Sequence, residues 1–274
     1  MLQIPPRPDL KPRISILASE CMREEIQRLH GTNYNVCTLS KAICATGHYS
    51  PFCSEVDSDV TIALLGPGDT QSANETLHLM RKIETCRSSL KIGITLGDFR
   101  NVHATTNDDT LTAARKSFDA DIFIGNKQLI YADHFFEMER PSTDAMMLLT
   151  LNTIIELMTG NSLIGVDFAD CLNALGRKGC SATGFGEAHS RDKARAAAKN
   201  AILSLRDYTD ATASGLVVNI AGGDDMTLDD VVLAAETVAE QVAAENASIT
   251  FCSTYDQSMS GGIRVSIIAA GLSE

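Results

Sequence analysis

Short apolar segments alternate with amphipathic segments through the first half of the chain. The apolar segments have the length of buried strands and lie at residues 13–18, 60–65, 91–96 and 121–124. Between them, apolar residues recur at helical spacing in three segments, at 22–29, 70–83 and 109–118. Strands that alternate with helices form right-handed crossover units in a parallel sheet. The sequence therefore predicts an α/β domain with a parallel, Rossmann-like sheet.

The most apolar helical segment, residues 142–158, follows this alternation and ends before Gly160. Apolar residues surround nearly its whole circumference, and only Asn152 and Glu156 suggest a polar stripe. A helix that is apolar on all sides is buried on all sides. We therefore expect a long central helix packed between two halves of the molecule, rather than an ordinary sheet-covering helix.

The pattern changes after this helix, where strands and helices follow a glycine-rich passage. The predicted order is strand 180–187, helix 191–205, strand 215–220, helix 227–244, strand 248–254 and strand 263–270. Thr227 and Asp230 have the spacing of a capping box at the start of the second of these helices. This order predicts a smaller α+β domain in the C-terminal part of the chain.

The charge balance excludes some classes of partner. The chain has 35 acidic and 23 basic residues, a net charge of −12, whereas non-specific nucleic-acid binding needs basic surface. No apolar run approaches the roughly 20 residues of a membrane span, and the first residues lack the layout of a signal peptide. We expect a soluble, cytoplasmic protein that binds no nucleic acid.

Eight cysteines are spread along the chain without any C-x-x-C pair, so we expect free thiols. The only cluster contains Cys37, Cys44, His48 and Cys53, whose spacing matches no closed zinc module. A free cysteine is often a small buried hydrophobe, and we predict no metal site. One alternative that stays open is a binding module that holds another ligand at the stretch from Cys37 to Cys53.

The second half contains the motifs Gly184-Phe-Gly-Glu-Ala188, Leu216-Val-Val-Asn-Ile-Ala-Gly-Gly223, Met226-Thr-Leu-Asp-Asp230 and Arg264-Val-Ser-Ile-Ile-Ala-Ala270. These motifs resemble those of the bacterial division protein family FtsZ. Upstream of them, Leu163-Ile-Gly-Val-Asp-Phe-Ala-Asp170 resembles the synergy loop of that family. The resemblance is dense from about residue 119 to residue 272 and implies the fold of the tubulin/FtsZ superfamily.

The resemblance implies GTP or GDP as the cofactor, held by backbone N–H groups of glycine-rich turns. The residues that match the family's main phosphate loop are Gly66, Gly68 and Thr70. However, Pro67 has no N–H to donate, and Asp69 places a carboxylate at the predicted helix start. The turn after the first strand contains no glycine and carries Glu20. Because carboxylates repel a triphosphate, we predict weak or absent GTP binding.

Two further residues match positions that contact guanine in the family. They are Asn126, directly after the strand at 121–124, and Asp144, at the start of the central helix. Each also has an ordinary structural explanation, because asparagine is common in turns and an acidic residue is favourable in the first turn of a helix. Both interpretations remain open at this point.

The synergy-loop resemblance gives Asp167 and Asp170 a catalytic role. In the family this loop enters the nucleotide site of the next subunit, and its two acidic residues position the attacking water. Gly165 stands where the family has an asparagine. The alternative is that Asp167 caps a helix whose first turn contains Asp170. The sequence does not decide between these two interpretations.

Together these patterns predict three regions. They are a degenerate GTPase-like domain with the central helix (1–160), a synergy loop with a connecting helix (161–178) and an FtsZ-like C-terminal domain (179–274). The favoured hypothesis is an FtsZ-like cytoskeletal protein that assembles head to tail or binds an FtsZ partner. The alternative is a working GTPase that forms filaments and supplies its aspartates across the subunit interface. Since the sequence stops at Glu274, we expect no direct membrane tether of the kind that FtsZ tails provide.

Overall fold

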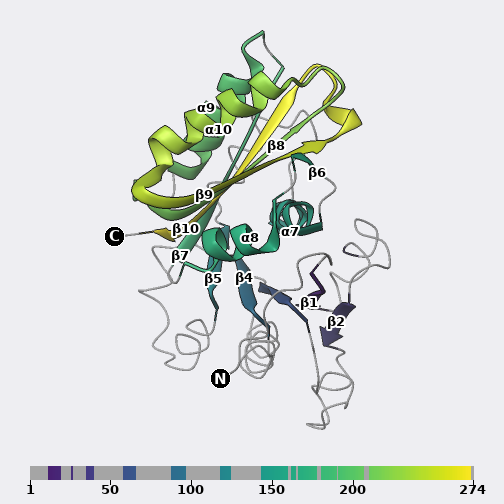
Figure 1. The fold of residues 1–274 in the computed structure, drawn as a ribbon. Helices are drawn as coiled ribbons and strands as arrows, with labels where there is room; N and C mark the ends of the chain where they lie inside the picture. The colour runs from purple at the N-terminus through teal and green to yellow at the C-terminus, as the bar shows by residue number, and fades with distance from the viewer. Residues whose placement is uncertain are drawn as a thin grey trace.

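The structure is a computed structural model, drawn as a ribbon in Figure 1. It describes residues 12–19, 26, 35–39, 58–65, 88–96, 118–124, 143–159, 162–164, 166–177, 180–189, 191–206 and 210–272. In Figure 1 the N-terminal strands lie below helices α7 (Thr143–Thr159) and α8 (Phe168–Leu175), and the C-terminal part lies above them. No helix within these described ranges is long and apolar enough to cross a membrane.

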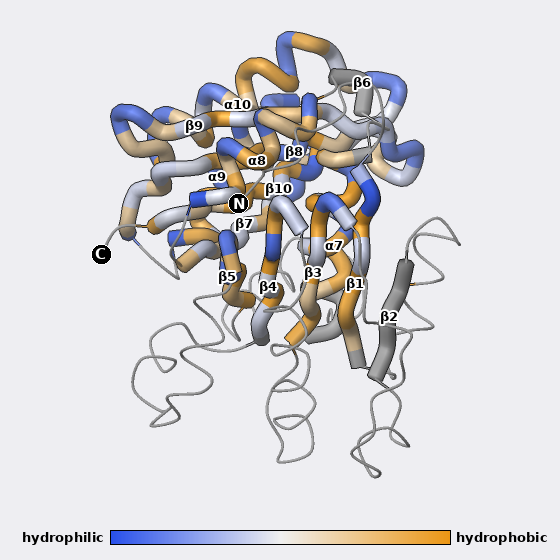
Figure 2. Tube along the Cα trace, turned by 60° about the horizontal axis from the view of Figure 1, so that its bottom comes forward, coloured by the Kyte–Doolittle hydropathy of each residue, from blue (hydrophilic) through white to orange (hydrophobic). Residues whose placement is uncertain are grey.

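The N-terminal strands form a parallel sheet in the order β2-β1-β3-β4-β5. Their bounds are β1 Ile14–Ser19, β2 Asn35–Leu39, β3 Val60–Leu65, β4 Leu90–Leu96 and β5 Ala120–Ile124. Every residue of β3 and β5 is buried, and Figure 2 shows β1, β3 and β5 as predominantly hydrophobic. The predicted parallel sheet is confirmed. Strand β2 was not predicted, because it lies in a stretch without clear periodicity.

The helices predicted between these strands fall almost entirely outside the described residues. Only Ile26, within the segment predicted at 22–29, is described, and it is helical and fully buried. The segments predicted at 70–83 and 109–117 lie outside the described part, and Phe118 is not helical.

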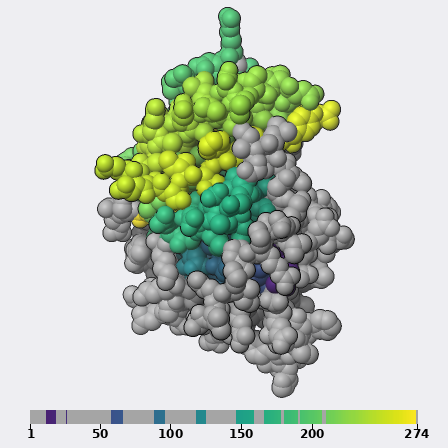
Figure 3. Space-filling view, in the orientation of Figure 1, coloured from purple at the N-terminus to yellow at the C-terminus, as the bar shows by residue number. Residues whose placement is uncertain are grey.

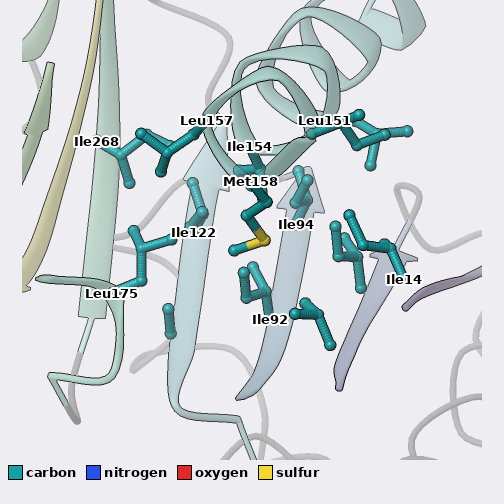
Figure 4. Packing of buried hydrophobic residues seen from close by; sticks show 14 of the residues in the cluster. Ile14, Ile92, Ile94, Ile122, Leu151, Ile154, Leu157, Met158, Leu175 and Ile268 are labelled. Atoms are coloured by element: carbon teal, nitrogen blue, oxygen red, sulfur yellow. The ribbon is translucent and has the colours of Figure 1, made fainter. Parts of the chain in front are cut away.

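Helix α7 is the predicted central helix, shifted by one residue at each end. None of its residues from Met146 to Met158 is exposed, which confirms burial around its whole circumference. Figure 4 shows α7 over the parallel sheet, with Met158 pointing toward Ile92 of β4. Side chains from the C-terminal part, including Ile268, complete the same hydrophobic core.

The C-terminal part is a four-stranded mixed sheet in the order β7-β10-β8-β9. Its elements are β7 Cys180–Ala188, α9 Lys193–Arg206, β8 Ala213–Gly222, α10 Leu228–Val242, β9 Ala243–Tyr255, the short 3-10 helix η3 Gln257–Met259 and β10 Ile263–Leu272. Strand β10 is antiparallel to β7 and β8, and β8 is parallel to β9. Helices α9 and α10 cover one face in a second hydrophobic core. The predicted capping box of Thr227 and Asp230 is confirmed.

The two halves share one ten-stranded sheet. Parallel pairing of β5 with β7 joins them, with Asp121 opposite Cys180 and Phe123 opposite Ala182. At the far end, the short strand β6 (Ser162–Ile164) pairs antiparallel with β9. The α/β fold class is therefore confirmed, and the domain boundaries at residues 160 and 178 stay a prediction.

Candidate functional site

The carboxyl ends of the parallel strands define the edge where an α/β sheet of this kind binds ligands. Strands β1, β3, β4 and β5 run in the same direction, so they all end at this edge. Of the residues predicted to hold GTP, Gly66, Gly68 and Thr70 directly follow β3, and Asn126 follows β5. These four lie outside the described residues. Asp144 is the second residue of α7, and only its backbone is described.

The acidic pair lies at the start of α8, on the connection from α7 to the C-terminal part. Asp167 is the N-cap, with an extended backbone (φ −79°, ψ 160°), and its Oδ1 accepts a hydrogen bond from the Asp170 N–H at 2.7 Å. Both aspartates are exposed. Among the described residues no hydrogen bond or ion pair engages the Asp170 carboxylate. The structure contains the cap that was one of the two interpretations of this pair, and it leaves the Asp170 side chain available at the surface.

Helix α8 is anchored on β8 and β9, which fixes the direction of the acidic pair. Its inner face buries Cys171, Ala174 and Leu175. The Thr250 hydroxyl of β9 donates to the Asp170 carbonyl at 3.4 Å. Gly215 of β8 allows the closest approach, because a Cβ there would lie 1.9 Å from the Ala174 carbonyl oxygen. Figure 3 shows the teal atoms of this region at the surface, next to the C-terminal strands.

Removing the cap is expected to loosen the start of α8. Asp167→Ala should lower the free energy of unfolding by about 1 kcal/mol, because the Asp170 N–H loses its acceptor. Asp167→Asn keeps a capping oxygen and serves as the matched control. Urea unfolding measures the free energy of unfolding of both variants. An equal decrease in the two variants would contradict the capping role.

A polar cluster that is buried at its β8 and β9 end and half-buried at α7 ties α7 to the C-terminal sheet close to this site. Glu156 of α7 accepts from the Asn152 side chain at 2.7 Å and from the Asn219 side chain of β8 at 3.1 Å. The side-chain Oδ1 of Asn219 in turn accepts from the Thr254 hydroxyl at 3.0 Å and the Cys252 thiol at 3.3 Å. Burial raises the pKa of Glu156, and the two amide hydrogen bonds oppose that rise. The cluster therefore holds a carboxylate between the two halves of the molecule.

The polar cluster was only partly predictable from the sequence. The sequence singled out Asn152 and Glu156 as a polar stripe on an apolar helix, and the structure brings them together. Asn219 belongs to one of the FtsZ-like motifs, but no role was predicted for it. Thr250 carried no recognisable signal, because its contact with Asp170 depends on tertiary packing.

The thiols beneath the site are predicted to be unreactive in the folded protein. Cys171 and Cys252 are free and buried, and burial raises the pKa of Cys171 to about 12 and that of Cys252 further. The thiolate is the reactive form, so both should resist iodoacetamide at pH 8 and react once the chain is unfolded. Peptide mass spectrometry measures this site by site, with the half-buried Cys180 as internal control. Labelling of Cys171 at the rate of Cys180 would contradict the prediction.

The exposed acidic pair can accept hydrogen bonds from a water molecule and orient it for attack. Within the part of the chain that the structure describes, no group of His, Cys, Asp and Glu side chains could hold a metal ion. Of the predicted cysteine cluster only the backbone of Cys37 is described, within β2.

Comparison with known proteins matches the second half of the chain to FtsZ. Residues 179–273 match the family model for the FtsZ family, C-terminal domain. The cell division protein FtsZ of Wolbachia pipientis is 38% identical over 151 residues, which are 54% of this chain and 46% of that protein. FtsZ of Rickettsia bellii is 36% identical over 151 residues, covering 54% of this chain and 32% of that protein. The matches therefore span less than half of the length of these relatives.

Solved structures extend the likeness to the whole fold. An empty FtsZ dimer of M. jannaschii has a TM-score of 0.76 at 19% identity, covering 96% of this chain and 89% of that chain. The chain therefore has the fold of FtsZ, and its residues 179–273 match the C-terminal domain of that family. Another solved structure, a GTPγS-bound protofilament of CetZ2 from Haloferax volcanii, has a TM-score of 0.58 at 13% identity, covering 96% of this chain and 94% of that chain.

The similarity to FtsZ gives the exposed acidic pair its context. The resemblance of residues 163–170 to the FtsZ synergy loop lies inside the stretch where the likeness to FtsZ is dense. The structure places both aspartates at the capped start of α8, and a catalytic role for them stays a prediction. The residues predicted to form the phosphate loops lie in the half of the chain that resembles FtsZ in fold rather than in residues.

Proposed function

We propose that this chain is an FtsZ-like cytoplasmic protein of the cell-division type that works by assembly and binds GTP weakly or not at all. It associates head to tail with copies of itself or adds to an FtsZ partner. The observation that carries the proposal is the Asp170 carboxylate, exposed beside the capped start of α8. That geometry suits a carboxylate that acts on a neighbouring subunit, because no described residue of this subunit forms a hydrogen bond or ion pair with it.

Weak GTP binding follows from the residues at the carboxyl edge of the sheet. Pro67 removes one phosphate-binding N–H, and Asp69 can cap the helix that a phosphate would otherwise bind. Glu20 places a second carboxylate in the turn after β1. Repulsion of about 1 kcal/mol or more for each carboxylate opposes a bound triphosphate. Any GTP or GDP that does bind would be held by Gly66, Gly68, Thr70, Asn126 and Asp144.

Nucleotide content of the purified protein tests this part of the proposal. We expect no guanine nucleotide in the acid extract of the full chain and no saturable binding at millimolar GTP. An FtsZ that binds its nucleotide tightly and retains it during purification serves as the positive control. Stoichiometric GDP in the extract would contradict the proposal.

The second candidate function is a working GTPase that hydrolyses GTP across the subunit interface. The exposure of both aspartates favours it, since this pair would orient water only in a neighbour's site. Phosphate release distinguishes the two functions. In a GTPase, Asp170→Ala abolishes release and leaves the fold intact, because the Asp167 cap uses only the backbone of residue 170. If our favoured proposal holds, the wild-type protein releases no more phosphate than Asp170→Ala.

A further inference from the structure

Helices α9 and α10 lie side by side on the outer face of the C-terminal sheet (Figure 1). They pack on the second hydrophobic core, whereas α7 and α8 pack on the first core from the opposite side of this sheet. Exposed residues recur along the outward side of both helices, so no described element covers this side. We call the two outward sides together the α9–α10 face.

A row of basic side chains runs along the outward side of α9. Arg195, Lys199 and Leu203 are exposed and lie four residues apart, so they share one side of the helix. Arg191, which is also exposed, extends this row into the turn before α9. Asp192 pairs with Arg195, with 3.5 Å between Oδ2 and Nε. The row keeps a net positive charge and ends in Leu203, which is 56% exposed.

Helix α10 carries a row of the opposite sign. Leu228, Val232, Glu236 and Glu240 are all exposed and lie four residues apart. Leu228 and Val232 are exposed by 65% and 39%, so this row begins apolar and ends acidic. The row lies within residues 207–263, a segment with ten acidic residues and no lysine, arginine or histidine.

The two rows do not neutralise each other within one chain. Although α9 and α10 are in contact, no ion pair or hydrogen bond between described residues engages the side chains of Arg191, Lys199, Glu236 or Glu240. Unpaired charges of opposite sign therefore stand on neighbouring rows, together with three of the six exposed large hydrophobic residues in the described ranges. A face of this kind is complementary to a second copy of itself, because each row meets the opposite sign when the two helices exchange places.

We propose that the α9–α10 face is a two-fold symmetric contact between two copies of this chain. Helix α9 of each copy lies over α10 of the other, so the basic row meets the acidic row twice and the exposed leucines are covered. The acidic pair at the start of α8 lies on the other side of the sheet, so this contact leaves it free. The contact is therefore separate from head-to-tail association.

Charge distinguishes a second copy from other partners of this face. A nucleic acid or an anionic membrane would be attracted to the α9 row but repelled by the α10 row beside it. A second copy supplies both signs. Ion pairs at a surface are individually weak, and the net charge of −12 opposes the approach of two copies. We therefore expect the contact at millimolar rather than micromolar protein.

Carbodiimide cross-linking of the full-length chain tests the contact. The reagent joins a lysine amine to a carboxylate as an amide where the two groups are in contact. An equal mixture of unlabelled and isotope-labelled chains separates links between two chains from links within one chain. At millimolar protein we expect mass spectrometry to find Lys199 of one copy linked to Glu236 or Glu240 of another. The links should persist in Asp170→Lys, which removes the group proposed for head-to-tail association.

Charge exchange gives the second part of the test. Arg191→Glu with Arg195→Glu keeps Lys199 and both α10 carboxylates, but it should lower the yield of these links about tenfold, because two acidic rows then face each other. Mixing this variant with Glu236→Lys, Glu240→Lys chains should restore the links, because opposite signs face each other again. The restored links join Lys199 of the second variant to Glu236 or Glu240 of the first.

The matched control changes the net charge equally but outside the face. It is Arg13→Glu with Arg177→Glu, two exposed residues that belong to neither helix, and it should keep the links. Circular dichroism checks that each variant is folded.

Three results would overturn the inference. One is the absence of links between wild-type chains, which would assign the face to a different protein. Another is an equal loss of links in the control variant, since net charge alone would then govern them. The third is a mixture of the two exchanged variants that stays unlinked, because the basic and acidic rows would then not meet.

Discussion

Asn219→Asp is expected to lower the free energy of unfolding by about 3 kcal/mol near neutral pH, because it breaks the buried cluster between α7 and β8. Asn219 is 3% exposed, and its amide donates to Glu156 at 3.1 Å. The substitution replaces that donor with a carboxylate oxygen, so two carboxyl groups meet in a buried place. Urea unfolding at a series of pH values measures the loss.

The loss of stability caused by Asn219→Asp should grow as the pH rises. Burial already raises the pKa of Glu156, and a second carboxyl group beside it raises the pKa of the pair further. The folded variant then holds a proton that the unfolded chain has released, so its stability falls as pH rises above the ordinary carboxyl pKa values. We expect the difference from the wild type to shrink in acid and to be largest at pH 8.

A double variant provides the control for this prediction. In Glu156→Gln with Asn219→Asp, donor and acceptor exchange places, because the glutamine amide can donate to the new carboxylate. This exchange should recover much of the loss caused by Asn219→Asp alone. Failure to recover it, or a loss that does not change with pH, would contradict the role we assign to the cluster.

Gly186→Ala is expected to destabilise the C-terminal part by about 3 kcal/mol, at the upper end of the usual cost of overpacking. A Cβ at this position would lie 2.2 Å from the Ala201 nitrogen and 2.3 Å from the Ala197 carbonyl oxygen. Both atoms belong to the backbone of α9, so no side-chain rotation relieves the clash. The helix would have to move away from β7 and expose the alanine face by which it packs. Urea unfolding followed by far-UV circular dichroism measures the loss.

The comparison variant for this prediction is Gly261→Ala. Gly261 has a φ of +81°, and a Cβ added there would meet no atom within 4 Å, so the cost of the substitution comes from backbone conformation alone. We expect a loss of about 1 kcal/mol there. If Gly186→Ala lowers the free energy of unfolding by no more than Gly261→Ala does, the close contact between β7 and α9 does not contribute to stability as we describe.

Most of the fold could be predicted because its strands are continuous apolar runs. The strand predicted at 60–65 has the observed bounds of β3, and the strand predicted at 121–124 differs from β5 by one residue. Strand β2 was missed because polar residues interrupt it. Strand β6 was missed because it has only three residues and depends on pairing with β9, far away in the sequence.

The candidate site was predictable only in its local part. The cap joins Asp167 to the backbone N–H of Asp170, three positions later, so it could be recognised from the local sequence. The pairing of Glu156 with Asn219 joins residues 63 positions apart and is set by the packing of α7 on β8. The phosphate-loop residues Gly66, Gly68 and Thr70 lie outside the described residues, and their role stays a prediction.

Sedimentation velocity of the full chain tests the central claim most directly. It is run with the protein alone, with GTP, and with a polymerising FtsZ. We predict that the chain either self-associates increasingly as its concentration rises or enters FtsZ polymers. Neither behaviour should require GTP binding by this chain. Asp170→Lys should abolish the association. A monomer that ignores both GTP and FtsZ under every condition would contradict the account.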